Sequence, residues 1–271
     1  MDADLASYLQ GVDGASAPPP DPTPPSQIWC TVCASERDAR FGGPLDWREQ
    51  GTCSGCGLAA RQRFCTTWLA GLAAGIADRP RIYVTEQASR TYYQLRRMHA
   101  GTVGSEYVGD ARRARSLQRA IDYHCGGPWR ARLQHQDLTA LALPDRHFDV
   151  VGSFDVLEHI PDYQRAIGEL FRVTRPGGWL VLTVPFLDRS IDTLVRARVA
   201  PTGAVEHLCP PEYHGEPVDD DGCLCFYHFG WDLLDRLRDT GFVEVGYVHC
   251  RAAELGFAGR VGAFVARRPS D

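Results

Sequence analysis

Two apolar runs that flank a single helical segment constrain the fold of this chain more than any other feature. The run FDVVGSF covers residues 148–154, and the run WLVLTVPF covers residues 179–186. Between them, residues 162–174 place apolar side chains at helical spacing, after Pro161 and before the stop signal Pro176-Gly177-Gly178. Strands separated by a helix pair in parallel, so the pattern predicts an α/β fold with a parallel, doubly wound sheet. Ligands of such sheets bind at the carboxyl ends of the strands.

The same alternation of strand and helix patterns begins near residue 80. The other predicted strands are 81–85, 102–107, a short one near 131–136, 242–249 and 261–267. The other predicted helices are 64–77, a segment that ends near His99, 110–122, and 231–240, which is closed by Gly241. Residues 187–225 are rich in Pro and Asp and are predicted to be irregular.

Composition divides the chain into three parts. Residues 18–25 read PPPDPTPP, which excludes a helix or a central strand, so residues 1–27 are predicted to be a disordered tail. Residues 28–63 are predicted to form a small metal-binding module, and residues 64–271 the main domain. Within that domain, residues 187–229 are predicted to be a lid-like insertion on the substrate side, because long irregular loops in compact domains are often functional.

Four cysteines in two CxxC pairs indicate the metal-binding module. Cys30 and Cys33 form the first pair, Cys53 and Cys56 form the second, and 19 residues separate the pairs. Two such pairs present four thiolates to one tetrahedral Zn²⁺ ion, and four cysteine ligands leave no position for water. A structural zinc ion is therefore predicted, since so small a segment needs such a constraint to fold. The alternative is two unrelated pairs of buried cysteines.

Charge and hydropathy limit the partners. Lys and Arg number 29 and Asp and Glu number 34, and the net charge of −5 counts against nucleic acid as the main partner. The longest apolar-leaning run, residues 64–77, is too short to span a bilayer. The first residues lack the basic start and apolar core of a secretory signal, so a cytoplasmic location is expected. The sequence does not indicate an oligomeric state.

Residues 148–186, FDVVGSFDVLEHIPDYQRAIGELFRVTRPGGWLVLTVPF, resemble the second half of class I S-adenosylmethionine-dependent methyltransferases, in particular the type 11-like group. In that family a strand, a Leu-Glu-His loop, a helix and a Pro-Gly-Gly turn before a buried strand follow in this order. The resemblance covers about residues 80–267 and implies a Rossmann-like fold that binds S-adenosylmethionine. Zinc-knuckle modules precede the methyltransferase domain in some bacterial families, and several of these are thought to act on sugars or polysaccharides.

The resemblance also implies candidate cofactor-binding residues. Glu106, with Tyr107 beside it, follows the second strand, where the family's carboxylate holds the ribose hydroxyls of the cofactor. A carboxylate suits this role because it offers two acceptors to a vicinal diol. The alternative for Glu106 is a surface carboxylate at a strand end. The remaining candidates are Asp137 and Leu138 for the adenine, and Phe154 and Asp155 beside the cofactor and substrate, with a helix-cap or loop role as the alternative for Asp155.

The turn after the first strand, residues 85–90 (TEQASR), departs from the family, in which an acidic residue is followed by three spaced glycines. Relatives with zinc knuckles can also lack these glycines while they keep the acidic residue. Here Glu86 would meet the ammonium of the cofactor, and Gln87, Ser89 or Arg90 its carboxylate. The alternatives are that Glu86 only caps the following helix, or that the domain no longer binds the cofactor.

Candidate acid–base residues lie after the strand 148–154 and in the insertion. His214 is the first candidate for a general base, and His159 and Asp155 complete the predicted catalytic set. Asp155, Glu158 and His159 also resemble a divalent-ion site of some quinone-modifying relatives, with a structural loop feature as the alternative. In the insertion, further candidate bases are Glu206, His207, Glu212 and His228. The alternatives are a second metal site from His207, Cys209, His214, Cys223 and Cys225, or a lid whose histidines are structural.

These features predict a methyltransferase that acts on a hydroxyl, or another nucleophile, of a sugar or small metabolite. Such an enzyme aligns the acceptor with the sulfonium methyl group and removes the acceptor's proton. One alternative is a non-catalytic binding or scaffold protein that has lost the cofactor loop. Another is a zinc-ribbon RNA methyltransferase, which a basic helix favours and the net charge opposes. The residues of that helix are Arg112, Arg113, Arg115 and Arg119.

Overall fold

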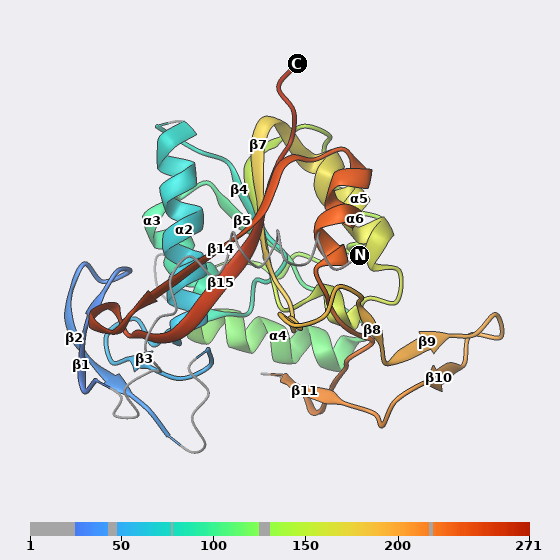
Figure 1. The fold of residues 1–271 in the computed structure, drawn as a ribbon, viewed down its shortest axis with the longest axis horizontal. Coiled ribbons are helices and arrows are strands. Elements are labelled where there is room, and N and C mark those ends of the chain that lie inside the picture. Colours follow the sequence, from blue (N-terminus) through green and yellow to red (C-terminus); the bar gives the residue numbers. More distant parts are fainter. Residues whose placement is uncertain (1–24, 43–47, 77, 125–130, 217–218) are drawn as a thin grey trace.

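A six-stranded sheet forms the centre of the computed structural model, which describes residues 25–42, 48–76, 78–124, 131–216 and 219–271 (Figure 1). The strand order is β14-β15-β7-β6-β4-β5. The strands are β4 (Ile82–Val84), β5 (Thr102–Gly104), β6 (Phe148–Phe154), β7 (Thr174–Thr183), β14 (Val243–Ala252) and β15 (Phe257–Arg267). Neighbours from β7 to β5 pair in parallel, whereas β15 is antiparallel to both β7 and β14. The sheet is therefore mixed, and the prediction of a parallel sheet is wrong for the last two strands.

The antiparallel pair has a simple cause. Only the short 3₁₀ helix η3 (Ala253–Leu255) and the left-handed Gly256 separate β14 from β15. So short a connection joins antiparallel strands, because a parallel crossover needs a dozen or more residues. The resulting hairpin is long, and in Figure 1 it extends past the sheet toward β1 and β2.

Helices cover both faces of the sheet and enclose two apolar cores. One face carries α2 (Ala60–Ile76), α3 (Arg90–Met98) and α4 (Ala111–His124), and the other carries α5 (Tyr163–Val173) and α6 (Asp232–Thr240) (Figure 1). Strand β6 shows why its sequence is continuously apolar. Phe148 and Val151 pack in the α5–α6 core, whereas Val150 and Phe154 pack in the α2–α3–α4 core. Within the described ranges, no helix combines the length and apolarity needed to cross a bilayer.

The predicted strand near residues 131–136 is wrong. Only an isolated bridge between Glu106 and His135 forms there. The side chain of Gln87 replaces part of the missing ladder, because it donates to the Arg132 carbonyl at 2.8 Å and accepts from the Gln134 amide at 2.7 Å. A glutamine side chain presents the same donor and acceptor as a backbone amide.

The insertion is more regular than its composition predicts. Residues 187–225 contain paired short strands rather than only irregular loop: β9 pairs with β10 and β11 with β12, and β8 pairs with β13, which lies just after this range. These strands are β8 (Leu194–Val195), β9 (Ala197–Val199), β10 (Val205–His207), β11 (Tyr213–Glu216), β12 (Asp219–Leu224) and β13 (Tyr227–His228). The β9–β10 part projects from the body of the molecule (Figure 1). The insertion is tied to the loop after β6, since the Phe226 amide donates to the Glu158 carbonyl at 2.7 Å.

The segment with the CxxC pairs forms a three-stranded antiparallel sheet of β1 (Gln27–Cys30), β2 (Ser35–Arg40) and β3 (Thr52–Cys53). It has a small core of its own, in which Ile28 and Leu58 pack with the cysteines. The predicted Pro-rich tail, residues 1–27, lies almost wholly outside the described residues, which begin at residue 25.

Arg63 joins this segment to the rest of the molecule. Its side chain is fully buried in α2 and donates to the carbonyls of Leu255 at 2.7 Å, and of Gly51 and Gly256 at 3.2 Å. Its guanidinium also lies 5.2 Å from the ring centroid of Phe257. One cation therefore links the cysteine-rich segment, α2 and the β14–β15 hairpin.

Replacing this cation tests the link. We expect Arg63→Leu to lower the free energy of unfolding by about 3 kcal/mol, because buried carbonyls lose their donors. Arg119→Leu, on the exposed side of α4, serves as the control and should change it by less than about 0.5 kcal/mol. Urea unfolding followed by circular dichroism measures both, and equal effects of the two substitutions would contradict the assigned role.

Candidate functional site at the carboxyl ends of the parallel strands

Three acidic residues follow three neighbouring parallel strands. Glu86 lies after β4, Glu106 after β5, and Asp155 directly after β6. Because β4 lies between β5 and β6, the chain leaves β4 toward one side of the sheet and returns on the other. Such a reversal of strand order is where ligands of open α/β sheets bind.

The turn after β4 is held by Glu106 rather than by glycines. The Oε1 atom of Glu106 accepts hydrogen bonds from the amides of Gln87 at 2.7 Å and Ala88 at 2.6 Å. The glycine that permits this packing lies in β5, because a Cβ on Gly104 would come within 2.6 Å of the Glu86 carbonyl oxygen. Sequence analysis placed Glu106 at a strand end but did not predict these bonds or the role of Gly104.

The other turn residues have structural partners. Ser89 is the N-cap of α3 and accepts from the Tyr92 amide at 3.1 Å. Both polar atoms of the Gln87 side chain bond to the 131–136 segment, as described above. Arg90 lies against Gly57 of the cysteine-rich segment, where a Cβ would come within 1.8 Å of its guanidinium. The geometry therefore does not direct Gln87, Ser89 or Arg90 toward a ligand carboxylate.

Glu86 combines a buried carboxyl oxygen with an unusual pKa. Burial, and then the nearby charge of Glu106, raise the pKa of Glu86 to about 7. Its Oε1 atom has no hydrogen-bond partner among the described residues. A buried acceptor without a donor is costly, so this position suits a cationic ligand that donates hydrogen bonds.

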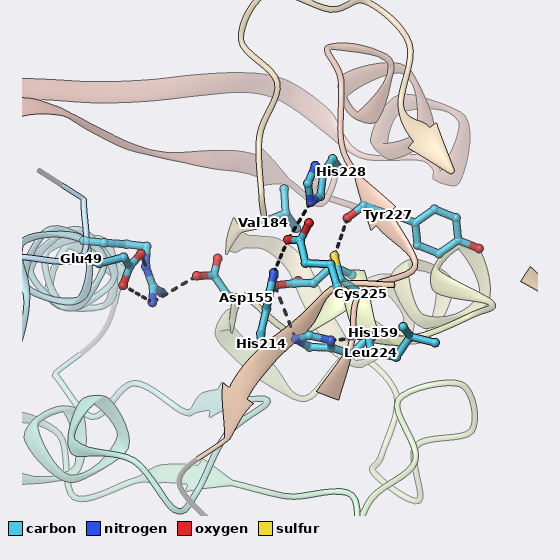
Figure 2. Close-up of polar contacts among 12 residues, drawn as sticks. Glu49, Asp155, His159, Val184, His214, Leu224, Cys225, Tyr227 and His228 are labelled. Carbon is cyan, nitrogen blue, oxygen red and sulfur yellow. Dashed lines mark hydrogen bonds and ion pairs between the residues drawn. The ribbon is translucent and has the colours of Figure 1, made fainter. Parts of the chain in front are cut away.

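Asp155 is paired with two arginines that sequence analysis did not select. Its carboxylate lies 2.6 Å from Arg48 Nη2 (Figure 2) and 3.1 Å from Arg61 Nη2. Glu49 contacts both guanidinium groups at 2.7 Å. Burial alone would raise the pKa of Asp155, but Arg61 and Arg48 outweigh it and hold the pKa below its usual range. The residue also adopts a left-handed conformation with φ of 53°, a strained geometry often found at functional sites.

The remaining cofactor candidates differ in their surroundings. Tyr107 is 60% exposed, and its ring lies 5.6 Å from that of His135. Asp137 closes its own turn by accepting from the amide and hydroxyl of Thr139, each at 2.8 Å. Leu138 and Phe154 bury their side chains in the two cores, so these side chains serve packing.

The loop after β6 and the insertion together form a group of imidazoles and carboxylates. His159 lies in the 3₁₀ helix η2 (Leu157–His159), and His214 lies in β11. Their rings are 5.1 Å apart at 86°, and the buried Glu158 carboxylate faces both. Glu212 Oε1 bonds to His214 at 2.9 Å and to His228 at 3.0 Å (Figure 2).

This grouping separates residues that sequence analysis had placed together. Asp155 pairs with the arginines and is not among the ligand atoms that converge at Glu158, His159 and His214. Within the described ranges, His207, Cys209 and Cys223 join no such convergent group either, whereas Cys225 does. The neighbouring Cys225, and then Glu158, raise the pKa of His214 to about 11. This disfavours a free general base there at neutral pH.

The four cysteines of the CxxC pairs converge as a tetrahedral zinc site requires. Their sulfur atoms all lie within 4.8 Å of one another, and the Cys30–Cys56 and Cys33–Cys53 separations are 3.7 and 3.9 Å. Zn–S bonds of about 2.3 Å in a tetrahedron place sulfurs about 3.8 Å apart. Amides of Cys33 and Gly55 point at sulfurs, at 3.4 and 3.3 Å. The donor set therefore fits Zn²⁺.

Known proteins resemble parts of this chain. Residues 90–182 match the family described as "Methyltransferase domain". A 56-residue segment is 43% identical to a probable S-adenosylmethionine-dependent methyltransferase of Mycolicibacterium smegmatis and covers 21% of this chain and 22% of that protein. A 164-residue segment is 37% identical to 27-O-demethylrifamycin SV methyltransferase of Amycolatopsis mediterranei and covers 55% and 60% of the two chains. The alignments thus span less than two thirds of either relative.

A solved structure resembles the whole chain. The [4+2]-cyclase SpnF aligns over 100% of this chain and 94% of its own, with a TM-score of 0.51 and 16% identity. At this identity the likeness is one of fold. The chain therefore has a Rossmann-like fold, and its residues 90–182 are similar to a methyltransferase domain. The relatives that share part of its sequence include one named as a probable S-adenosylmethionine-dependent methyltransferase.

The Asp155 ion pairs make a prediction about pH. The pKa of Asp155 is lower in the folded chain than in the unfolded chain. The ionised carboxylate therefore stabilises the fold fully above the unfolded pKa, and this contribution is lost as pH falls through the folded pKa. We expect Asp155→Asn to lower the free energy of unfolding by roughly 1–3 kcal/mol at pH 7, since Arg61 loses its partner. The difference in this free energy between the variant and the unmodified chain should shrink below about pH 4.

A surface pair provides the control for this experiment. Asp235 bonds to Arg238 on α6 with 63% of its side chain exposed. Asp235→Asn should therefore lower the free energy of unfolding by less than about 0.5 kcal/mol. Denaturant titrations from pH 3 to 8 measure both variants. A difference for Asp155→Asn that does not vary with pH would contradict the ion-pair assignment.

Proposed function

We propose that the chain is an S-adenosylmethionine-dependent methyltransferase that methylates a hydroxyl group of a sugar or another small metabolite. The observation that carries the proposal is the row of acidic residues after β4, β5 and β6, within and beside the segment that matches the methyltransferase domain. Polar groups at this edge of the sheet would hold the cofactor and the acceptor together.

Glu86 and Glu106 are the proposed anchors of the cofactor. The buried Oε1 of Glu86 would accept from the ammonium of S-adenosylmethionine, which fits an acceptor that has no donor among the described residues. Glu106 would hold the ribose hydroxyls while its Oε1 keeps the turn in place. The backbone near Asp137 and Leu138, and Tyr107, would border the adenosine. The cofactor supplies an activated methyl group on a sulfonium.

The residues after β6 are proposed to handle the acceptor. Asp155 is held ionised by Arg48 and Arg61, so it would orient the acceptor or the methyl group electrostatically rather than take a proton. His159 and Glu158, rather than His214 with its raised pKa, are proposed to receive the proton that the acceptor hydroxyl releases when its oxygen gains the methyl group.

The nature of the acceptor rests on resemblance. The relative from Amycolatopsis mediterranei is named for an O-demethylated small molecule, which favours an oxygen acceptor in this chain. The insertion is fastened to the loop after β6 and would cover the acceptor. The cysteine-rich module is proposed to bind one structural zinc ion and, through Arg48, to bring a cation to Asp155.

A second candidate function is a non-catalytic binding protein. It is favoured by the turn after β4, whose amides at Gln87 and Ala88 already bond to Glu106. The likeness in fold to a protein described as a cyclase also shows that this architecture serves more than methyl transfer.

Calorimetric titration with S-adenosylmethionine and S-adenosylhomocysteine separates the two functions. We expect a dissociation constant between about 1 μM and 1 mM. Glu106→Ala should weaken binding at least about tenfold, since hydrogen bonds to a charged group are lost. The near-isosteric Glu106→Gln should retain more of the affinity. Asp239→Ala, on an exposed position of α6, is the control. Absence of heat and of a thermal shift at millimolar ligand would favour the non-catalytic protein.

The raised pKa of Glu86 predicts a pH dependence of cofactor binding. Only the ionised carboxylate attracts an ammonium, so affinity should fall as pH drops below about 7, by up to tenfold per pH unit. Glu86→Gln should bind weakly with little pH dependence. Because the folded pKa lies above the unfolded one, ionisation of Glu86 destabilises the unliganded chain as pH rises. Glu86→Gln should therefore have the higher Tm at pH 8, and a lower Tm would contradict this account.

A further inference from the structure

The Glu158 carboxylate occupies an unusual position outside the proposed cofactor site. Its side chain is fully buried in η2, after β6, and neither oxygen has a hydrogen-bond partner among the described residues. Two imidazole nitrogens lie close to its Oε1 atom, His214 Nδ1 at 3.6 Å and His159 Nε2 at 3.8 Å. A buried carboxylate without a hydrogen-bond donor is costly, so it requires a positive charge beside it, from a protonated imidazole or a bound cation.

The opposite sides of both imidazoles show where their protons lie. His159 Nδ1 is 2.8 Å from the Leu224 carbonyl oxygen, which can only accept, so Nδ1 donates. His214 Nε2 is 2.9 Å from a carboxylate oxygen of Glu212, so Nε2 donates. A bound metal ion displaces any proton from the other nitrogen, so in the metal-bound form that nitrogen of each imidazole presents a lone pair. Those two lone pairs, on His159 Nε2 and His214 Nδ1, face the carboxylate of Glu158.

Three atoms that can each donate an electron pair to one point describe a metal site. Ligands of a tetrahedral ion with bonds of about 2.0–2.2 Å lie about 3.3–3.6 Å apart. The separations of 3.6 and 3.8 Å between the Glu158 oxygen and the two nitrogens are close to this, and all three ligand atoms lie within 4.8 Å of one another. Metal-binding histidines typically donate their second nitrogen to a carbonyl or carboxylate, as both do here.

We propose that Glu158, His159 and His214 bind a divalent transition-metal ion, of the Zn²⁺ type, in addition to the zinc ion of the cysteine module. Two imidazoles and one carboxylate suit Zn²⁺ and its neighbours, whereas Mg²⁺ and Ca²⁺ prefer oxygen ligands. The third ligand comes from the insertion, so the ion would also fasten β11 to the loop after β6.

Two other ligand sets are less suitable. Glu212, His214, Cys225 and His228 also bring ligand atoms within 4.8 Å of one another. However, Glu212 is already compensated by His214 and His228 on Oε1 and by Arg196, at 3.1 Å, on Oε2. Asp155, the third member of the set that the sequence suggested, is committed to two arginines.

An ion with three protein ligands keeps a position for an external oxygen. Water, or the hydroxyl of an acceptor, would bind there and become more acidic. This role rests on the proposed methyl transfer, whereas the binding of the ion does not.

The test is a count of zinc in the purified full-length chain. After loading with Zn²⁺ and dialysis against metal-free buffer, inductively coupled plasma mass spectrometry should find two ions per chain. His159→Asn and the near-isosteric Glu158→Gln should each hold one. In competition with a chelator, the affinity of the second ion should fall at least about 100-fold in both variants, which is the upper end of the loss seen for partners of metal ligands.

Matched variants distinguish the ligand sets. His207→Asn, on the exposed strand β10, and His228→Gln should both retain two ions. One ion in the unmodified chain, or two in folded His159→Asn and Glu158→Gln, would overturn the proposal. Loss of an ion in His228→Gln with retention in His159→Asn would assign the site to the Glu212 set instead. Circular dichroism of each variant confirms folding, and titration with S-adenosylmethionine tests the methyltransferase proposal separately.

Discussion

The buried guanidinium of Arg63 is the interaction on which the assembly of this molecule depends. It satisfies carbonyls of the cysteine-rich segment and of the β14–β15 hairpin from one position in α2. Arg61 lies two residues earlier in the same helix, and Arg48 lies in the segment that Arg63 secures. The two arginines beside Asp155 are therefore positioned by the contacts of Arg63. Those contacts involve residues far in the sequence from Asp155, which follows β6.

Much of this architecture could be predicted from sequence because its signals are local. The β6–α5–β7 unit follows from apolar runs and Pro-Gly punctuation, and the cysteine cluster follows from its spacing. The placement of Glu86, Glu106 and Asp155 at strand ends follows from the same local pattern, because parallel strands end at one edge. The family resemblance added the expectation of S-adenosylmethionine, which the comparisons support at the level of the domain.

What sequence did not predict depends on contacts between distant residues. No local pattern marks Arg48 as a partner of Asp155, 107 positions away. The side chain of Gln87 bonds to the backbone of residues 132 and 134. The segment 131–136, predicted to be a strand, therefore satisfies part of its backbone without a paired strand. The antiparallel β15 and the paired strands of the insertion depend on turn geometry and tertiary pairing, to which hydrophobic periodicity is insensitive.

The pairing of Asp155 with Arg48 and Arg61 determines which residues a fragment of this chain must include to keep the site electrostatically balanced. The family match starts at residue 90, yet the positive charge opposite Asp155 comes from residues 48 and 61. A domain cut at the family boundary would keep the whole stretch from α3 to β7 and still present an uncompensated buried anion at its ligand-binding edge. The electrostatic boundary of the site thus lies some forty residues before the boundary that sequence similarity defines.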